Sequence, residues 1–113
     1  MIDKTTAEHY QWGEQCDGWY LLKRDDLLII HEKMPSQTAE RRHYHHHARQ
    51  FFFVLSGELT MEVAGIVHQI SAQQGIEIPP HSLHQASNQS EQVVEFLVIS
   101  QPTTRGDRED LPI

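Results

Sequence analysis

Histidines with the spacing of metal ligands are the most informative feature of this chain. Four of its 9 histidines lie within five consecutive positions, from His43 to His47. In a β-strand, residues two apart point to the same face about 7 Å from each other, so His43 and His45 would project together. Two neutral imidazoles placed in this way are suited to binding one metal ion. The pair alone is weak support, because most exposed histidine clusters are solvated.

Two polar positions further along the chain strengthen the hypothesis of a metal site. Gln50 begins an apolar run whose alternation puts Phe52 and Val54 on the same face, the interior of a barrel. A polar side chain buried there would need a partner. His84 follows a Pro-Pro turn and begins another β-favouring segment. Two histidines of one strand, Gln50 of the next and His84 of a distant strand could therefore converge.

Short β-favouring runs, separated by Gly, Pro, Ser and Asn, would position these side chains. The pattern predicts strands over Trp19–Lys23, Leu27–Lys33, Ala39–His45, Gln50–Leu55, Glu58–Ala64, Val67–Ile70, Gly75–Ile78, Leu83–Asn88 and Val93–Ser100. Many short strands without helical periodicity indicate an all-β sandwich or small barrel. Residues 1–15 are expected to form an N-terminal arm, with a short helix as an alternative for the first dozen. We expect the charged tail, residues 102–113, to be partly loose.

Length and composition indicate one soluble domain, spanning residues 1–113. A net charge of -7 argues against a nucleic-acid partner. Cys16 is the only cysteine, which rules out an intramolecular disulfide and fits a reducing, cytoplasmic location. No apolar run approaches the length of a membrane span, so we expect no membrane partner.

The spacing of the polar residues resembles that of the cupin superfamily. The first cupin motif is His-x-His, three or four residues, Glu, six residues and Gly, and the second ends in a Pro-to-His segment followed by Asn. This chain matches them with His43, His45, Gln50, Gly57, Pro79, His84 and Asn88. The motifs cover roughly residues 39–88. The resemblance implies an all-β, single-domain cupin β-barrel, a double-stranded β-helix of jelly-roll type.

Three positions depart from the cupin motifs. His81 and Gln73 stand where glycines are usual, and we expect these two changes to alter only the shape of loops. Gln50 stands where the acidic ligand is usual. A neutral amide oxygen is a weaker ligand than a carboxylate, which predicts a looser metal site or one suited to an anionic substrate. In the alternative interpretation Gln50 only donates or accepts a hydrogen bond behind three histidine ligands; we favour ligation.

The resemblance implies a divalent transition metal, which could be Fe, Ni, Zn, Cu or Mn, bound by His43, His45, Gln50 and His84. His47 could replace His45 if the hairpin shifted by one pair. No catalytic residue is assigned. Glu77 and Glu95 lie in apolar runs, where either could be a general base or could pair with a cation on an outer face.

The leading functional hypothesis is a metal-dependent oxygenase, isomerase or lyase acting on a small organic molecule, with the metal as Lewis acid or oxygen activator. The alternative is a non-catalytic module that binds a sugar or another small molecule. A third interpretation treats the histidines as an accidental patch. The resemblance also implies a homodimer, with which the apolar outer face of Phe51, Phe53 and Leu55 and the aromatic N-terminal arm are compatible.

Overall fold

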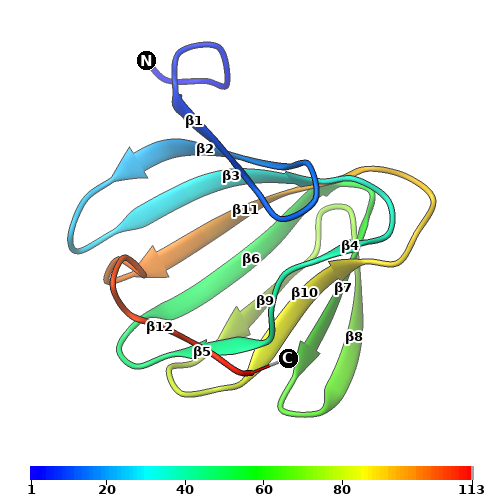
Figure 1. The fold of residues 1–113 in the computed structure, drawn as a ribbon. Coiled ribbons are helices and arrows are strands. Elements are labelled where there is room, and N and C mark those ends of the chain that lie inside the picture. The colour runs from blue at the N-terminus through cyan, green and yellow to red at the C-terminus, as the bar shows by residue number, and fades with distance from the viewer. Residues whose placement is uncertain (113) are drawn as a thin grey trace.

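Two antiparallel β-sheets face each other and enclose the interior of the protein (Figure 1). The computed structural model describes residues 1–112, in which no helix could cross a membrane. The first sheet has the order β1 (Glu8–Trp12), β2 (Cys16–Lys23), β3 (Leu28–Met34), β11 (Val94–Gln101), β6 (Arg49–Ser56) and β9 (Gly75–Ile78). The second has the order β12 (Arg108–Asp110), β5 (His43–His45), β10 (His84–Asn88), β7 (Glu58–Val63) and β8 (Ile66–Ser71), and β4 (Thr38–Ala39) pairs with β10. The prediction of an all-β barrel is confirmed.

Strict alternation along the central strands separates the interior from the outer face. On β6, Gln50, Phe52 and Val54 are buried, whereas the intervening side chains are exposed or half-buried. Inward positions at one end of the barrel are apolar and form a core cluster that contains Phe96, Met34, Leu59 and Met61. At the other end, polar side chains such as His43, Gln50 and Ser100 share the inward face with apolar ones. The fold therefore places a filled core beneath a cavity lined by polar and apolar side chains.

One glycine of the first motif is required by a close approach of two backbones. Gly57 lies between β6 and β7 with a φ of 83°. A Cβ atom at this position would lie 2.4 Å from the carbonyl oxygen of Val93. Neither the left-handed conformation nor the contact accommodates a larger residue.

His81 and Gln73 adopt the backbone conformation that favours the glycines they replace. Their φ angles are 68° and 69°. A positive φ is strained for a residue that carries a Cβ atom, so both positions hold backbone strain that a glycine would not have.

The structure differs from the predicted strands at both ends and in the segment before His43. Residues Glu8–Trp12 form strand β1, not a helix, and pair with the early part of β2. The predicted strand Ala39–His45 is two strands, β4 and β5. It is interrupted at Glu40, whose carboxylate accepts a hydrogen bond from the backbone N–H of Ala86 at 2.9 Å.

The C-terminal segment 102–110, here named the strap, is fixed to the barrel. Asp107 accepts hydrogen bonds from the backbone N–H groups of His46, His47 and Ala48 at 2.9–3.1 Å. Strand β12 then pairs with β5, with Arg108 opposite His45. The expectation of a partly loose tail is wrong for this segment, because the buried Asp107 carboxylate accepts hydrogen bonds from three consecutive backbone N–H groups.

Candidate metal centre

His43 and His45 lie on the inward face of β5, as their spacing predicted. Both side chains are buried, and their ring centroids are 4.9 Å apart. Strand β5 is held between β10 on one side and β12 on the other. The backbone of this short strand is therefore supported on both edges, which fixes the directions of the two rings.

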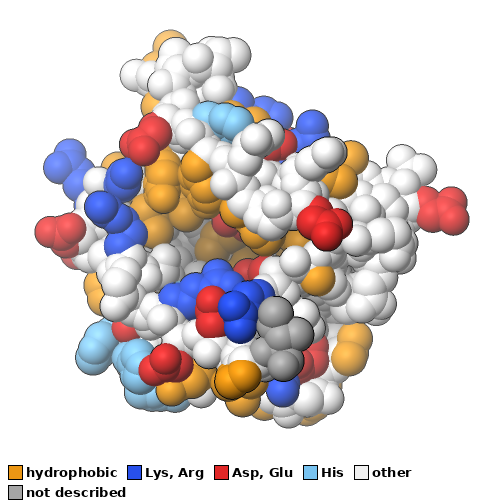
Figure 2. All heavy atoms as spheres, in the orientation of Figure 1, with side chains coloured by type: hydrophobic (Ala, Val, Ile, Leu, Met, Phe, Trp, Pro, Cys, Tyr) orange, Lys and Arg blue, Asp and Glu red, His pale blue; other side chains and the backbone are white. Residues whose placement is uncertain are grey.

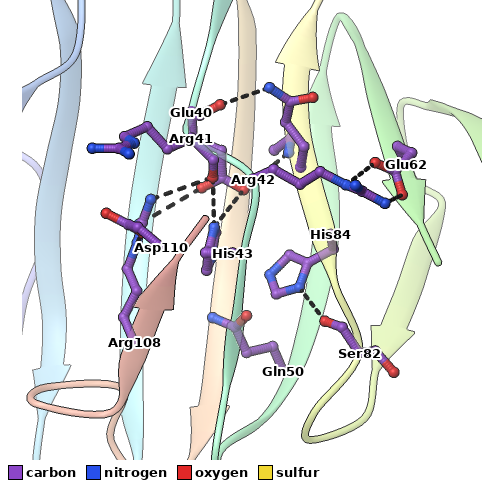
Figure 3. Close-up of polar contacts among 12 residues, drawn as sticks. Glu40, Arg41, Arg42, His43, Gln50, Glu62, Ser82, His84, Arg108 and Asp110 are labelled. Atoms are coloured by element: carbon purple, nitrogen blue, oxygen red, sulfur yellow. Dashed lines mark hydrogen bonds and ion pairs between the residues drawn. The ribbon is translucent and has the colours of Figure 1, made fainter. Parts of the chain in front are cut away.

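His84 begins β10 directly opposite His43 in the strand register. Its side chain is fully buried, and its ring centroid lies 4.3 Å from that of His43 (Figure 3). The ligand nitrogens of His43, His45 and His84 all lie within 4.8 Å of one another. Two nitrogens bound to one tetrahedral ion would lie about 3.3 Å apart, so small side-chain rotations suffice to bring the three onto one ion.

Hydrogen bonds to backbone carbonyls orient two of these rings. The Nδ1–H of His43 donates to the carbonyl oxygen of Arg41 at 2.7 Å, and that of His84 donates to Ser82 at 2.9 Å (Figure 3). This assignment leaves the lone pair on Nε2 of each ring, which is the arrangement of metal-binding histidines. The Nε2 atom of His84 and both ring nitrogens of His45 are buried without a hydrogen-bond partner among the described residues. The donor set fits a bound cation, because such unpaired buried atoms are otherwise costly.

Burial keeps the three imidazoles neutral. It lowers the pKa of His43 to about 3 and that of His45 to about 4, and it also lowers the pKa of His84. The nearby His84 ring further lowers the pKa of both other residues. At neutral pH the cluster therefore presents free lone pairs, the protonation state that metal binding requires.

Gln50 lies on β6 below the rings of His43 and His84 (Figure 3). Its side chain is 6% exposed, and its Nε2 donates to the hydroxyl oxygen of Ser100 on β11 at 3.2 Å. The amide oxygen is buried and has no hydrogen-bond partner among the described residues. The bond to Ser100 thus fixes the amide and leaves its oxygen free.

The other residues considered from the sequence lie outside this cluster. His46 and His47 are exposed in the turn that follows β5. His45 is buried and His47 is exposed, so His47 does not replace His45 in the cluster. Glu77 forms an ion pair with Arg49 and is exposed. The carboxylate of Glu95 lies 2.9 Å from both Lys4 and His31. Glu77 and Glu95 therefore form ion pairs on outer faces, and neither faces the cavity as a general base would.

A cavity of about 170 Å³ opens beside the histidines. In Figure 2 the molecule is hollowed between the sheets, with apolar side chains deep inside and Lys and Arg side chains along the lower rim. The lining combines groups of both sheets and of the strap: His43, His45, Gln50, Glu32, Glu40, Tyr10, Tyr20, Leu28, Ile30, Phe52, Val98, Ser100, Thr104, Arg105 and Arg108.

Several polar groups of the cavity were not identified from the sequence. Glu32 and Glu40 are carboxylates facing the interior, and Tyr10 reaches the cavity from β1. The sequence carried a signal for Glu32, because Leu28, Ile30 and Glu32 share one face of β3 with buried residues. No local pattern indicates Glu40, Tyr10 or the strap arginines, which reach the site only through tertiary pairing.

Burial controls the charge of the two carboxyl groups. It raises the pKa of Glu32 to about 7, although the hydrogen bond from Tyr10 acts in the opposite direction. Burial likewise raises the pKa of Glu40 to about 8, against the hydrogen bond from Ala86. Near neutral pH both groups can therefore gain or lose a proton. A cavity with such carboxyl groups beside three neutral imidazoles has the components for metal binding and proton transfer.

Comparison with solved structures supports the fold. The structure is similar to that of KdgF from Halomonas sp. (TM-score 0.83, 16% identity, covering 91% of this chain and 93% of that one). It is similar to the polyketide cyclase RemF from Streptomyces resistomycificus (TM-score 0.83, 14% identity, 100% and 85% covered). A predicted oxalate decarboxylase from Thermotoga maritima has a TM-score of 0.81 at 18% identity, with 91% and 99% covered. At these identities the likeness shows the fold alone.

The comparison with curated proteins found no match. The family model described as a cupin domain matches residues 29–100, which include every member of the histidine cluster and Gln50. The chain belongs to the cupin family.

Proposed function

We propose that this cupin is a metal-dependent enzyme that acts on a small organic molecule. The observation that carries the proposal is the convergence of His43, His45 and His84 on one point, with buried ring nitrogens that lack partners. A purely structural histidine cluster would satisfy these atoms with hydrogen bonds. The adjoining cavity gives a substrate access to the same point.

His43, His45 and His84 would each supply one ring nitrogen to the metal, and Gln50 would supply its amide oxygen. A bound divalent ion would act there as a Lewis acid that polarises a substrate oxygen. Gln50 is proposed as a ligand because its hydrogen bond to Ser100 leaves the oxygen available. Four neutral donors leave the full charge of the ion uncompensated, which favours an anionic substrate. This donor set accommodates Fe, Ni, Zn or Cu, with Mn less favoured.

Within the proposed class, isomerase or lyase chemistry suits the cavity better than oxygenation. Glu32 on the wall opposite the histidines and Glu40 beside His43 are carboxyl groups that burial holds near their protonation midpoint at neutral pH. Such groups can accept and return protons during a reaction. The arginines of the strap, Arg105 and Arg108, face the same cavity and would attract a substrate with negative charge.

We further propose that the protein functions as a homodimer. On the outer face of the first sheet, cross-strand neighbours Ile99 and Phe51 are apolar, and Phe51 is 39% exposed. The rings of Phe51 and Phe53 extend this apolar surface along β6. A second copy packed against this surface would remove it from water.

A metal-dependence assay tests the proposed function. The protein is stripped with a chelator and reloaded separately with zinc, iron, nickel, copper or manganese. Each form is incubated with a panel of small hydroxy acids, keto acids and sugar phosphates, and the products are followed by NMR. We expect turnover only in a metal-loaded form. Tight metal and ligand binding without turnover of any compound would instead support the non-catalytic binding module.

A further inference from the structure

A tyrosine and a carboxyl group form a hydrogen-bonded pair on the cavity wall formed by the first sheet. The hydroxyl of Tyr10 on β1 donates to Oε1 of Glu32 on β3 at 3.2 Å. Both residues line the cavity that contains His43, His45 and Gln50. The pair lies on the first sheet, whereas the three histidines lie on the second. A small molecule in the cavity would thus lie between the pair and the histidines.

The position of Tyr10 depends on a glycine in the neighbouring strand. Tyr10 and Gly18 are direct partners in the register of β1 and β2. A Cβ atom on residue 18 would lie 2.2 Å from Cζ of Tyr10 and 2.5 Å from its hydroxyl oxygen. The tyrosine ring also packs against Tyr20, with centroids 4.9 Å apart. Gly18 therefore provides the space in which the phenol reaches Glu32.

Glu32 differs from Glu40 in what its carboxyl group contacts. The carboxylate of Glu40 accepts a hydrogen bond from the backbone N–H of Ala86, and its Oε2 lies 4.0 Å from a guanidinium nitrogen of Arg108. Glu40 therefore helps to join the strap to the second sheet. Glu32 accepts a hydrogen bond from Tyr10 and forms no ion pair with the described residues. A buried carboxyl group with so little support costs stability. The packing of β3 does not require a carboxyl group at position 32, since apolar Ile30 and Met34 occupy the flanking inward positions.

The charged and titratable groups around Glu32 keep it responsive near neutral pH. The other charged and titratable groups that line the same cavity come from both sheets and from the strap: Tyr10, Tyr20, Glu40, His43, His45, Arg105 and Arg108. Burial raises the pKa of Glu32, while Tyr10 and Arg108 lower it by smaller amounts. Burial also raises the pKa of Tyr10, so the phenol stays protonated and continues to act as a donor.

We propose that Glu32 is the general base of the reaction and that Tyr10 positions its carboxylate. This inference rests on the proposed function and identifies the substrate as a small carbonyl compound with a hydrogen on the neighbouring carbon. The C–H bond breaks, its proton moves to a Glu32 oxygen, and its electron pair shifts through the carbonyl group onto oxygen to give an enolate. Return of the proton to carbon completes the cycle without another reactant.

Exchange of substrate hydrogen with solvent deuterium tests the inference. The metal-loaded protein is incubated in D₂O with pyruvate, 2-oxobutyrate, dihydroxyacetone or glyceraldehyde, and loss of the C–H signal is followed by proton NMR. We expect at least one compound to exchange, with a rate about 100-fold lower in Glu32→Gln or below detection. Tyr10→Phe should slow exchange about 10-fold and displace the acidic limb of its pH profile. Glu77→Gln, on the outer face of β9, is the matched control and should exchange like the wild type.

Two readouts separate failure of this inference from failure of the proposed function. Metal content and circular dichroism are measured for every variant, and we expect both to be unchanged in Glu32→Gln. Infrared difference spectra should show two protonated carboxyl signals that titrate near neutral pH, those of Glu32 and Glu40. The Glu32 signal should be lost in Glu32→Gln while that of Glu40 remains, and it should move to lower pH on metal loading. Exchange that persists in Glu32→Gln would overturn the general-base role of Glu32 but would leave the proposed metal-dependent function standing. A wild type that binds metal but exchanges none of the compounds would overturn the general-base inference, and a wild type that binds no metal would overturn the proposed function.

Discussion

Replacement of Glu32 by glutamine should make the free energy of unfolding less dependent on pH. Burial raises the pKa of Glu32 from 4.5 to about 7. The folded protein therefore retains a proton that the unfolded chain loses, and stability falls as the pH rises between these two values. The glutamine side chain is nearly isosteric with that of glutamate. Its amide oxygen can accept the hydrogen bond from the Tyr10 hydroxyl, and it has no charge to bury.

The magnitude follows from the size of the pKa shift. The reference is low pH, where Glu32 is protonated in both the folded and the unfolded state. Relative to it, the raised pKa lowers the free energy of unfolding of the wild type by ~1.4 kcal/mol at about pH 5.5 and by ~3.4 kcal/mol at about pH 8.5. The stability of Glu32→Gln relative to the wild type should therefore increase by ~2 kcal/mol between these two pH values. The depressed pKa values of the buried histidines act in the opposite direction, destabilising the fold as pH falls below 6.5, but they cancel in the comparison.

Urea denaturation of metal-free protein at the two pH values measures this difference, because the transition midpoint and slope give the free energy of unfolding. Metal must be absent, since a cation in the cavity would favour the ionised carboxylate. The exposed outer-face variant Glu77→Gln is the control and should show a nearly constant difference. An equally constant difference for Glu32→Gln would refute the claim that burial shifts the ionisation of Glu32.

Three other perturbations test separate parts of the structure. Asp107→Ala removes the acceptor of three backbone N–H groups and should lower the free energy of unfolding by ~3 kcal/mol in urea titrations; an unchanged midpoint would mean that the strap is not anchored there. His81→Gly relieves a left-handed residue with a φ of 68° and should raise Tm by about 4 °C in calorimetry, corresponding to ~1 kcal/mol; a lower Tm would contradict the assigned strain. Phe51→Lys places a charge on the apolar outer face and should convert a dimer into a monomer in light scattering. A wild type that is already monomeric, or a variant that stays dimeric, would rule out this interface.

The sequence predicts the inward-facing part of the site because strand alternation is a local property. His43 and His45 are two residues apart, and Gln50 begins an alternating run, so their common direction follows from backbone geometry alone. His84 could be added only through the resemblance to cupin motifs, since its strand lies far along the chain. The structure brings all four residues to one end of the barrel.

The remaining polar groups of the cavity could not be found in the same way. Tyr10 enters the site because an N-terminal segment forms an edge strand, which no local pattern distinguished from a helix. Arg105 and Arg108 line the cavity because Asp107 anchors the strap to the barrel through hydrogen bonds. The polar composition of this segment predicted only a partly loose tail. The alternation of β3 indicates that Glu32 lies on the inward face of an apolar strand, so Glu32 could have been found from the sequence. Glu40 could not, because its contact with Ala86 depends on tertiary pairing.

The metal site is tested most directly by the metal content of protein purified without a histidine tag or a metal column. Elemental analysis by mass spectrometry is run on the wild type and on the His45→Ala/His84→Ala double variant, before and after reconstitution with each candidate ion. A double variant with the exposed residues His46 and His47 replaced by alanine is the matched control. We predict about one equivalent of metal in the wild type and in the control, and none in His45→Ala/His84→Ala. A wild type that retains no metal after reconstitution, or a His45→Ala/His84→Ala variant that retains as much as the wild type, would contradict the proposed metal centre.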